Sequence, residues 1–335
     1  MRATNRDSRS SVRTIANCAI QCALLSCVLF LLAACRSDPD PLRIGVLAWP
    51  PYDLAHLAVD EGLISRSSYD LVNFQTPSEV VRSFRYGLID AMFVTSHFAL
   101  SAIRDVGDVR IIYIVDVSLG GDALLVRPGF ESAEALEGAR IGVESAPLGI
   151  YTLVRALGQL GLSSGDISIV NVDTPQQLDA WQDGSVDALV AYEPTRSKIK
   201  REGGIEIFNS ESIPYEILDV LVVRQSMLDE RRGDLSRFIG ALDQALTQFR
   251  EDIDAVSERF AKRHALTAGE FRDAMASVEL FDIEDNLSML NDPSHPVLDA
   301  LRKQCRVMVQ AGMLRTEPDL EPLLDASVVK MAAGR

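Results

Sequence analysis

Two similar runs of alternating strand and helix patterns follow one another along this chain of 335 residues. Apolar, strand-like segments alternate with stretches that open on helix-capping residues and close on glycine. The expected strands of the first run are 42–47, 69–74, 89–94 and 109–117, and those of the second are 122–126, 140–143, 167–172, 186–191 and 218–223. We therefore expect an α/β protein of two lobes, each a mixed or parallel sheet flanked by helices.

After residue 224 the pattern becomes mainly helical. Ser226 is expected to cap a helix, with Asp229 three residues later in the capping-box position. Apolar residues between Phe238 and Phe260 recur every three or four positions, which predicts a helix packed on a core. Shorter helices are expected near 269–279 and 296–310.

The first 34 residues have the pattern of an export signal. Four arginines precede a run of mostly apolar residues, 19–34, that is short for a membrane span. The run ends in Leu-Ala-Ala-Cys at 32–35, which resembles the lipobox of bacterial lipoproteins. That resemblance implies cleavage before Cys35 and a lipid on its sulfur, with an uncleaved anchor helix as the alternative. Residues 35–41 contain two prolines and are expected to form a tether.

Composition and motifs exclude several classes of function. A net charge of −15 repels phosphate backbones, so we expect no nucleic-acid partner. Without the signal, only Cys35 and Cys305 remain, and we expect no disulfide. The four histidines lack metal-ligand spacing, and no nucleophile elbow is present. We therefore expect no metal, no cofactor and no catalytic residue.

Several segments, taken in order, resemble one family of binding proteins. Two of these segments are 121–127 and 132–143. The further segments are 57–63, 87–91, 184–188, 192–194 and parts of 311–325. They resemble substrate-binding proteins of ABC transporters, in the group that serves nitrate, sulfonates, taurine and thiamine-precursor pyrimidines. The resemblance covers nearly the whole chain after the signal, and it depends on the order and spacing of these segments.

The resemblance implies a periplasmic-binding-protein fold of the second type. Lobe 1 would comprise 42–120 and 224–335, lobe 2 would comprise 121–223, and hinge crossovers would lie near 118–123 and 219–225. The lobes would close on a small ligand and deliver it to an ABC permease and ATPase complex. The protein would be a monomer, held by lipid on Cys35 to a membrane facing the periplasm or cell exterior. Two alternatives remain: a ligand-sensing lipoprotein for a membrane receptor, and an enzyme of pyrimidine or menaquinone synthesis on the same fold.

Ligands in such folds bind at loops beyond the carboxyl ends of the strands. Trp49 and Tyr52 follow the first expected strand, and their rings suit an apolar, aromatic or cationic ligand. Thr95 and Ser96 follow the third, where hydroxyls and free N–H groups at a helix start accept an anionic or carbonyl group. We expect these four residues to contact the ligand.

The resemblance adds further candidates. In the family, the loop after the strand at 140–143 touches the ligand, which implies a role for Ser145. The segment Tyr192-Glu193-Pro194 matches a Trp-Glu-Pro motif whose acid accepts a hydrogen bond from a ligand amino group, although tyrosine replaces tryptophan here. Ser118, near the first crossover, completes the candidate set.

No arginine or lysine stands at these strand ends. We therefore expect an amine-bearing, zwitterionic or heterocyclic ligand rather than a free anion. Two acids near the candidates are given no ligand role, because we expect Asp122 to be structural and Glu144 to be solvated.

Overall fold

The computed structural model describes residues 40–292 and 294–334. The expected signal peptide 1–34, the lipid acceptor Cys35 and most of the tether lie outside these residues. Within the described ranges, no helix combines the length and the apolar character needed to cross a membrane.

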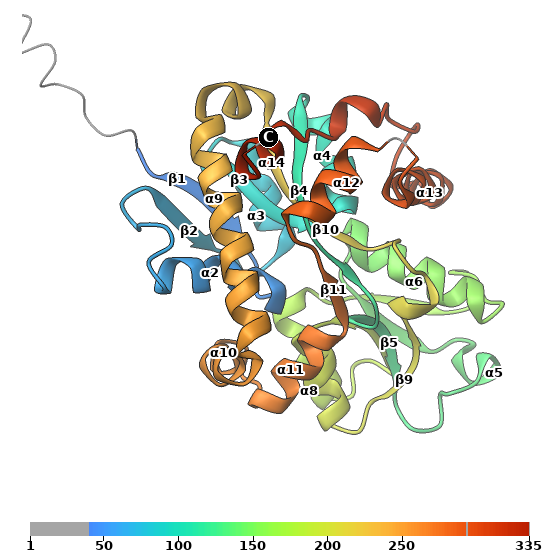
Figure 1. The fold of residues 1–335 in the computed structure, drawn as a ribbon. Coiled ribbons are helices and arrows are strands. Elements are labelled where there is room, and N and C mark those ends of the chain that lie inside the picture. Colours follow the sequence, from blue (N-terminus) through green and yellow to red (C-terminus); the bar gives the residue numbers. More distant parts are fainter. Residues whose placement is uncertain (1–39, 293, 335) are drawn as a thin grey trace, which may run out of the picture. The chain divides into compact units, whose positions relative to one another are not determined.

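The first sheet has six strands in the order β11-β4-β10-β3-β1-β2 (Figure 1). Their bounds are β1 (Leu42–Val46), β2 (Tyr69–Asn73), β3 (Ala91–Thr95), β4 (Val109–Ser118), β10 (Leu218–Arg224) and β11 (Val278–Leu280). Strand β1 is parallel to β2 and β3, whereas β10 runs antiparallel between β3 and β4. The sheet is mixed because the chain returns from the second sheet and inserts β10 between two strands of the first run.

The second sheet has five strands in the order β7-β6-β8-β5-β9. Their bounds are β5 (Asp122–Val126), β6 (Arg140–Val143), β7 (Ser168–Asn171), β8 (Ala188–Tyr192) and β9 (Ile205–Asn209). Strand β6 is parallel to β7 and β8, and β5 is antiparallel to β8 and β9. The expected α/β architecture of two helix-flanked sheets is confirmed.

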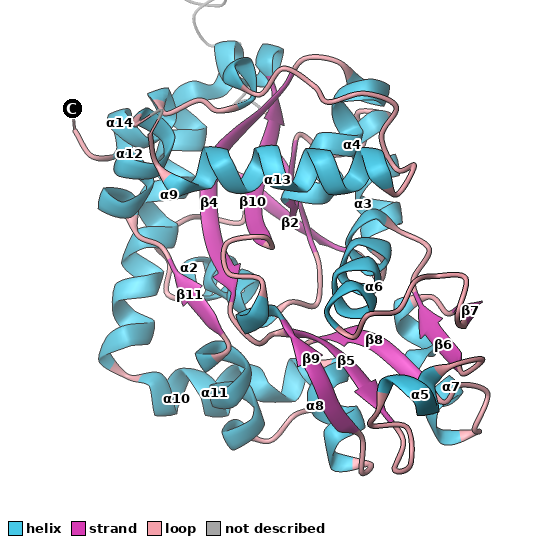
Figure 2. Cartoon of the chain, turned by 90° about the vertical axis from the view of Figure 1, so that its right-hand side faces the viewer, coloured by secondary structure: helices cyan, strands magenta, loops and turns pink. Residues whose placement is uncertain are grey.

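Helices cover both sheets (Figure 2). Their bounds are α2 (Asp53–Asp60), α3 (Pro77–Arg85), α4 (Ser96–Val106), α5 (Ala133–Leu136), α6 (Pro147–Gln159), α7 (Gln177–Gln182), α8 (Thr195–Arg201), α9 (Gln225–Glu251), α10 (Ile253–Phe260), α11 (Ala268–Ala276), α12 (Ile283–Asn291), α13 (Pro296–Gln310) and α14 (Ser327–Ala332). The long helix α9 packs beside α2 and α14 (Figure 1). Helix α13 contacts both α4 and α6, and so links helices that belong to different sheets.

The two sheets share a short sequence repeat with the same hydrogen bonds in each copy. The tetrapeptide Arg-Ile-Gly-Val occupies 43–46 in β1 and 140–143 in β6. In each copy the arginine Nη2 donates to a carboxylate Oδ1 at 2.7 Å, and its backbone N–H donates to Oδ2 of the same residue at 2.9 Å. The acceptors are Asp90 and Asp187, each just before the strand that pairs with the copy. The same clip therefore joins two parallel strands in each sheet.

Two details differ from expectation. Strand β10 belongs to the first sheet, whereas the expected boundary placed most of it in lobe 2 at 121–223. Helix α9 begins at Gln225 without a side-chain cap, so the prediction of Ser226 as N-cap is wrong. The physical reason is that β10 runs directly into α9, which leaves no separate capping turn.

Candidate functional site

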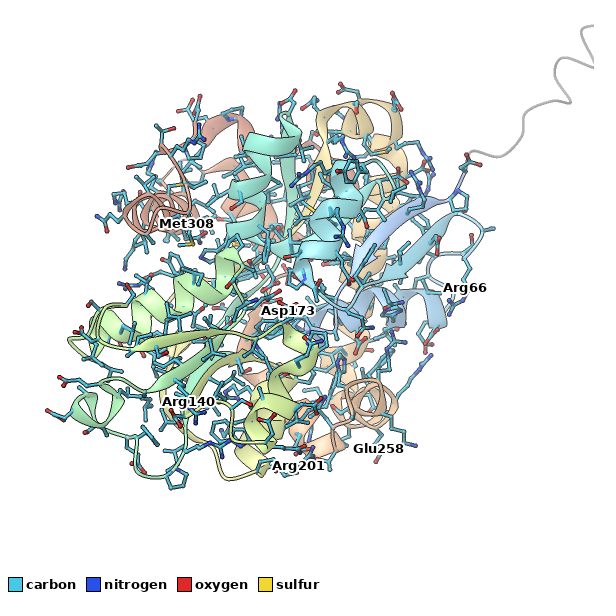
Figure 3. All side chains as sticks on the ribbon, turned by 180° about the vertical axis from the view of Figure 1, so that it is seen from behind. Arg66, Arg140, Asp173, Arg201, Glu258 and Met308 are labelled. Carbon is cyan, nitrogen blue, oxygen red and sulfur yellow. The ribbon has the colours of Figure 1, made fainter. Side chains whose placement is uncertain are left out.

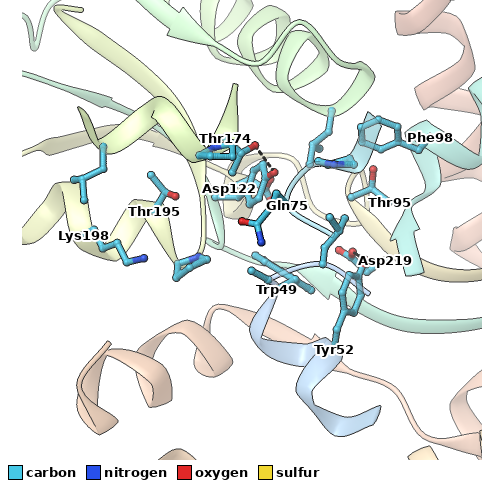
Figure 4. Close-up of a pocket in the computed structure, with 18 of the residues that line it drawn as sticks. Trp49, Tyr52, Gln75, Thr95, Phe98, Asp122, Thr174, Thr195, Lys198 and Asp219 are labelled. Atoms are coloured by element: carbon cyan, nitrogen blue, oxygen red, sulfur yellow. Dashed lines mark hydrogen bonds between the residues drawn. The ribbon is translucent and has the colours of Figure 1, made fainter. Parts of the chain in front are cut away.

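A cavity of about 280 Å³ lies between the two sheets (Figure 4). Its lining comes from residues at or just after the ends of β1, β3 and β8, and from the first residues of β5 and β10. The first turns of several helices complete it. Apolar and aromatic side chains form most of the wall. The polar and charged lining residues are Gln75, Thr95, Asp122, Thr174, Asp179, Thr195, Lys198 and Asp219.

Trp49 forms part of the wall and makes three contacts with different elements. Its indole Nε1 donates a hydrogen bond to Asp116 Oδ2 at 3.2 Å. Its ring meets Tyr192, at the end of β8, edge to face with centroids 6.4 Å apart. A Cβ atom on Gly121 would lie 2.7 Å from the indole Cη2, so only glycine leaves room for this ring position. Trp49 therefore joins the first sheet to the segment that enters the second.

Tyr52 lies in a short 3-10 turn, Pro50–Tyr52, whose two prolines preset the backbone. Its hydroxyl donates a hydrogen bond to Asp219 Oδ1, and its ring stacks on Phe93 with centroids 5.0 Å apart. The turn therefore fixes a buried phenol against a buried carboxyl group of β10.

Three polar residues lie side by side across neighbouring strands. Asp219 of β10 is the register partner of Thr95 on β3 and of Asp116 on β4. Directly paired residues project from the same face of a sheet, so the three side chains form a row. We call Thr95, Asp219 and Asp116 the carboxyl row. Asp122, at the start of β5, lies close enough for its charge to act on both aspartates of the row.

The carboxyl row and Asp122 are buried, and burial disfavours their charged forms. Burial raises the pKa of Asp219 to about 8 and the pKa of Asp122 to about 6. Burial, followed by the charge of Asp219, holds the pKa of Asp116 well above its usual range. No arginine or lysine of the described residues forms an ion pair with any of these aspartates, so their carboxyl groups are buried without a neutralising cation.

The opposite end of the cavity is cationic. Lys198, in α8, lines the cavity, and its ammonium group forms no hydrogen bond or ion pair with any described residue. Burial, and secondarily the charge of Arg201, lowers its pKa. Figure 4 shows Lys198 and Thr195 on one side and Thr95, Asp219 and Tyr52 on the other, with Trp49 between them. Lys198 therefore lies on the side of the cavity away from Asp219.

One wall joins the 3-10 turn Thr174–Gln176, just before α7, to β8. Thr174 donates to Glu144 Oε2 at 3.3 Å, and its hydroxyl also lies 2.9 Å from the Tyr192 hydroxyl. Glu144 is only 5% exposed, so the expectation of a solvated charge is wrong. Burial raises its pKa to about 7, with a smaller contribution from Asp173. Asp173 lies where elements of the two sheets meet in the view from behind (Figure 3).

Three of the residues expected to bind the ligand line this cavity. They are Trp49 and Tyr52, which follow β1, and Thr95, the last residue of β3. The hydroxyl of Thr95 has no hydrogen-bond partner although the residue is only 8% exposed. These three residues therefore share one cavity, and ligand contact by them stays a prediction.

The other four expected residues do not line the cavity. Ser96 donates to Gln304 Oε1 at 2.7 Å, and the Ser118 hydroxyl lies 2.8 Å from that of Ser210. The backbone N–H of Ser145 donates to Asn171 Oδ1 at 3.0 Å. The carboxylate of Glu193 is held by two neighbours on α8, Arg196 at 2.9 Å and Ser197 at 3.0 Å. Ligand contact by these four residues stays a prediction.

The residues that give the cavity its charge were not among the predicted ligand contacts. Asp122 was expected to be structural, and Asp219 and Lys198 were given no role. The sequence does show one sign of Asp219, because this aspartate stands inside an otherwise apolar strand. Burying a carboxyl group costs free energy, so an aspartate at such a position indicates a specific role. Lys198 follows no strand end, since it lies one turn into α8.

Comparisons with known proteins agree with this architecture. A family model described as "NMT1-like family" matches residues 36–262. The taurine-binding periplasmic protein of Escherichia coli (strain K12) is 26% identical over 170 residues, which are 50% of this chain and 52% of that protein. The alignment thus spans about half the length of this relative.

Solved structures show the fold over most of the chain. The alkanesulfonate-binding protein SsuA from Xanthomonas axonopodis pv. citri, bound to MOPS, has a TM-score of 0.68 at 19% identity and covers 87% of this chain and 98% of its own. The desulfurization enzyme DSZB has a TM-score of 0.66 at 18% identity and covers 89% and 99%. The fold is that of periplasmic binding proteins, as the sequence resemblance implied, and it is shared by binding proteins and by an enzyme.

Proposed function

This chain belongs to the NMT1-like family, and we propose that it is an extracytoplasmic solute-binding protein that delivers a small ligand to an ABC importer. The single observation that carries the proposal is the cavity of about 280 Å³ lined from both sheets. The contact between Trp49 and Tyr192 spans the two sheets beside that cavity, as expected for lobes that close around a ligand. The similarity to binding proteins that are named for taurine and alkanesulfonates supports the same function.

We propose a ligand that bears an amine, is zwitterionic or is heterocyclic, in preference to a free anion. The buried Asp122 and Asp219 supply acceptors to the cavity, and Lys198 is the one cationic side chain among the described lining residues. Aromatic walls such as Trp49 suit a flat or apolar ligand body. We propose lobes of 42–120 with 218–335 and of 121–217, which moves the expected boundary from 224 to the start of β10.

A screen for ligand-induced stabilisation tests the proposal. Ligand in a hundredfold excess over Kd stabilises the folded protein by about 2.7 kcal/mol, which raises Tm measurably. Trp49→Ala is expected to weaken binding, whereas Tyr86→Ala is a matched control because Tyr86 is 70% exposed. If no amine, sulfonate, pyrimidine or nitrate raises Tm, and no small molecule co-purifies with the protein, the proposal is wrong.

Export and lipid attachment form a separate part of the proposal. Cys35 would carry the lipid after removal of residues 1–34 and would hold a monomer at a membrane surface. Labelled palmitate should enter the full-length protein and be lost in Cys35→Ser. Cys305→Ser is the control, because Cys305 is buried in α13 and should not affect labelling. An unlabelled wild type contradicts lipid attachment without affecting the proposed binding function.

We propose that the bound ligand leaves unchanged. Among the described residues no group of three His, Cys, Asp or Glu side chains is arranged to hold a metal ion, and the buried Cys305 does not line the cavity. Because DSZB is an enzyme on this fold, the point needs a direct measurement. Mass spectrometry of a ligand after hours with the protein should recover it intact, and a new product would favour the enzymatic alternative.

A further inference from the structure

Glu216 lies where the chain crosses from the second sheet back to the first. It belongs to the segment between β9 and β10 and is only 1% exposed. Its Oε2 accepts hydrogen bonds from the Tyr151 hydroxyl at 2.6 Å and from Arg155 Nε at 2.7 Å. Its Oε1 accepts a hydrogen bond from Arg155 Nη2 at 3.0 Å and lies 2.5 Å from Lys303 Nζ. This buried charge is therefore fully paired, and its partners come from two different helices.

The partners of Glu216 belong to helices that connect different sheets. Helix α6, which supplies two of the donors, packs on β5, β6 and β8 of the second sheet. Helix α13 supplies Lys303, and the next residue, Gln304, accepts a hydrogen bond from Ser96 at 2.7 Å. Ser96 opens α4, which packs on β3, β4 and β10 of the first sheet. Figure 2 shows α13 running past both α4 and α6, so α13 and Glu216 together join a helix of one sheet to a helix of the other.

The same helices also make a contact that opposes their association. The His97 ring, on α4, meets the Tyr151 ring, on α6, with centroids 4.3 Å apart. Burial lowers the pKa of His97 to about 3, so the ring is neutral, and neither of its nitrogens has a hydrogen-bond partner among the described residues. Gln304 Nε2 is likewise buried without a partner in the described part of the chain. Such atoms lose hydrogen bonds that water would supply, so they disfavour this packing.

These contacts lie directly behind the wall of the cavity. Thr95 and Phe98, which flank them in the chain on α4, line the cavity, and Leu148 lines it from the first turn of α6. We define the helix junction as the residues that make the contacts, none of which lines the cavity: Ser96, His97, Tyr151, Arg155, Glu216, Lys303 and Gln304. A separation of the two sheets would part α4 from α6, and so would open the cavity and the helix junction together.

We propose that the helix junction sets the affinity of the cavity for its ligand, because it balances a closed against an open arrangement of the two lobes. The bonds of Glu216 favour the closed arrangement. The unpaired nitrogens of His97 and Gln304 favour the open one, in which water reaches them. This inference rests on the proposed binding function and concerns the control of the same cavity. Where only the closed arrangement holds ligand, the measured Kd is the intrinsic Kd divided by the closed fraction, so both change by the same factor.

Fluorine NMR of ligand-free protein labelled with fluorotryptophan measures the closed fraction. The chain contains two tryptophans. Trp49 contacts Tyr192 across the two sheets, so its resonance should differ between the closed and the open arrangement. Trp181 is buried in a separate core cluster of the second sheet, where Arg127 covers its ring, and is the internal reference. The closed fraction follows from the peak areas, or from the averaged position, of the Trp49 resonance.

Two substitutions in the helix junction should act in opposite directions. Glu216→Gln removes the charge at its centre, so the ratio of closed to open molecules should fall by at least about threefold. His97→Phe keeps a ring but removes the unpaired nitrogens, so the ratio should rise by at least about threefold. Lys303→Arg keeps the positive charge and should match the wild type. Glu206→Gln is the control, because Glu206 pairs with Arg196 at 2.6 Å between β9 and α8, within one lobe.

Calorimetry with the zwitterion 3-aminopropanesulfonate measures affinity in the same variants. Kd should rise in Glu216→Gln and fall in His97→Phe, each by the factor by which the closed fraction changes. A purely structural role would not tighten binding in any variant, so the opposite signs distinguish control of closure from loss of stability. If Glu216→Gln does not fold, Lys303→Met replaces it as the variant expected to open the lobes.

Several outcomes overturn the proposal. These are an unchanged closed fraction in both Glu216→Gln and His97→Phe, a change of the same sign in both, or a changed closed fraction with an unchanged Kd. If the closed fraction shifts as expected and 3-aminopropanesulfonate binds to no variant, the helix junction stands and the zwitterionic ligand class fails. If the compound binds and the closed fraction is the same in every variant, solute binding stands and the helix junction fails.

Discussion

The indole Nε1 of Trp49 donates a hydrogen bond to the buried carboxyl group of Asp116 at 3.2 Å, across 67 positions of the chain. The bond connects the loop after β1 to the end of β4, the strand from which the chain leaves the first sheet. It also fixes one wall of the cavity to the carboxyl row. A ligand that moves Trp49 would therefore also change the surroundings of Asp116.

Trp49→Phe tests the energetic value of this bond. The substitution keeps an aromatic ring but removes the donor, so we expect the free energy of unfolding to fall by about 1–3 kcal/mol. Asp116→Leu removes the acceptor. The double variant should lose less free energy of unfolding than the two single variants together, because it leaves neither partner of the bond unpaired. Urea unfolding of the four proteins measures the coupling, and strictly additive effects would show that the bond contributes nothing.

Gly121→Ala should displace the indole. The new Cβ would lie 2.7 Å from Trp49 Cη2, closer than van der Waals contact permits, and overpacking of this kind costs about 1–3 kcal/mol. We expect a lower Tm together with weaker ligand binding and changed tryptophan fluorescence. Gly158→Ala is the control, because a Cβ on that glycine of α6 would meet nothing within 4 Å. A Gly121→Ala protein that binds ligand like the wild type would contradict this role for the glycine.

The buried aspartates should make stability depend on pH. Their folded-state pKa values are raised, to about 6 for Asp122 and about 8 for Asp219, so the folded state holds protons that the unfolded chain has lost. The contribution of these protonated carboxyl groups to stability is complete below about pH 4 and is lost as the pH rises to about 8. Between its unfolded-state and folded-state pKa, each group lowers the free energy of unfolding by up to about 1.4 kcal/mol per pH unit. Urea unfolding across this range measures the slope. Asp219→Asn should flatten the slope between pH 6 and 8, and an identical slope in that variant would contradict the assignment.

Glu216 should stabilise the contact between α6 and α13. Its carboxylate accepts hydrogen bonds from Tyr151 at 2.6 Å and Arg155 at 2.7 Å, both on α6, and pairs with Lys303 on α13 at 2.5 Å. Burial opposes its charge, but these bonds lower its pKa on balance. Glu216→Gln should cost about 1–3 kcal/mol, measured by urea unfolding at pH 7.

The control for Glu216 is Lys303→Met. The lysine is 47% exposed, so its loss should cost less than about 1 kcal/mol. Because folding lowers the pKa of Glu216, its carboxylate stabilises the fold at pH values above the ordinary pKa of a glutamate. The difference in free energy of unfolding between Glu216→Gln and wild type should therefore shrink as the pH falls below about 4. Equal stability of Glu216→Gln and wild type at pH 7 would show that the charge is dispensable.

Local pattern was sufficient for much of the fold because strand and helix periodicity are short-range properties. The segment Arg43–Val46 and its copy at 140–143 were recognisable as strands from their apolar residues alone. Strand β11 (Val278–Leu280) was not expected, because three residues carry too little period to separate a strand from a loop. The sequence predicted that Trp49, Tyr52 and Thr95 lie near one another, because the carboxyl ends of the parallel strands β1 and β3 share one edge of the sheet.

The sequence by itself determined the α/β class, the duplication, the family resemblance and the aromatic part of the cavity wall, since each depends on residue type and near spacing. Only the tertiary structure decided the cavity's charge. Thr95, Asp219 and Asp116 become neighbours because β10 inserts antiparallel between β3 and β4, which brings Asp219 beside residues more than a hundred positions earlier in the chain. Pairing and burial of this kind arise from packing between distant segments, and they bring three polar side chains into one buried row.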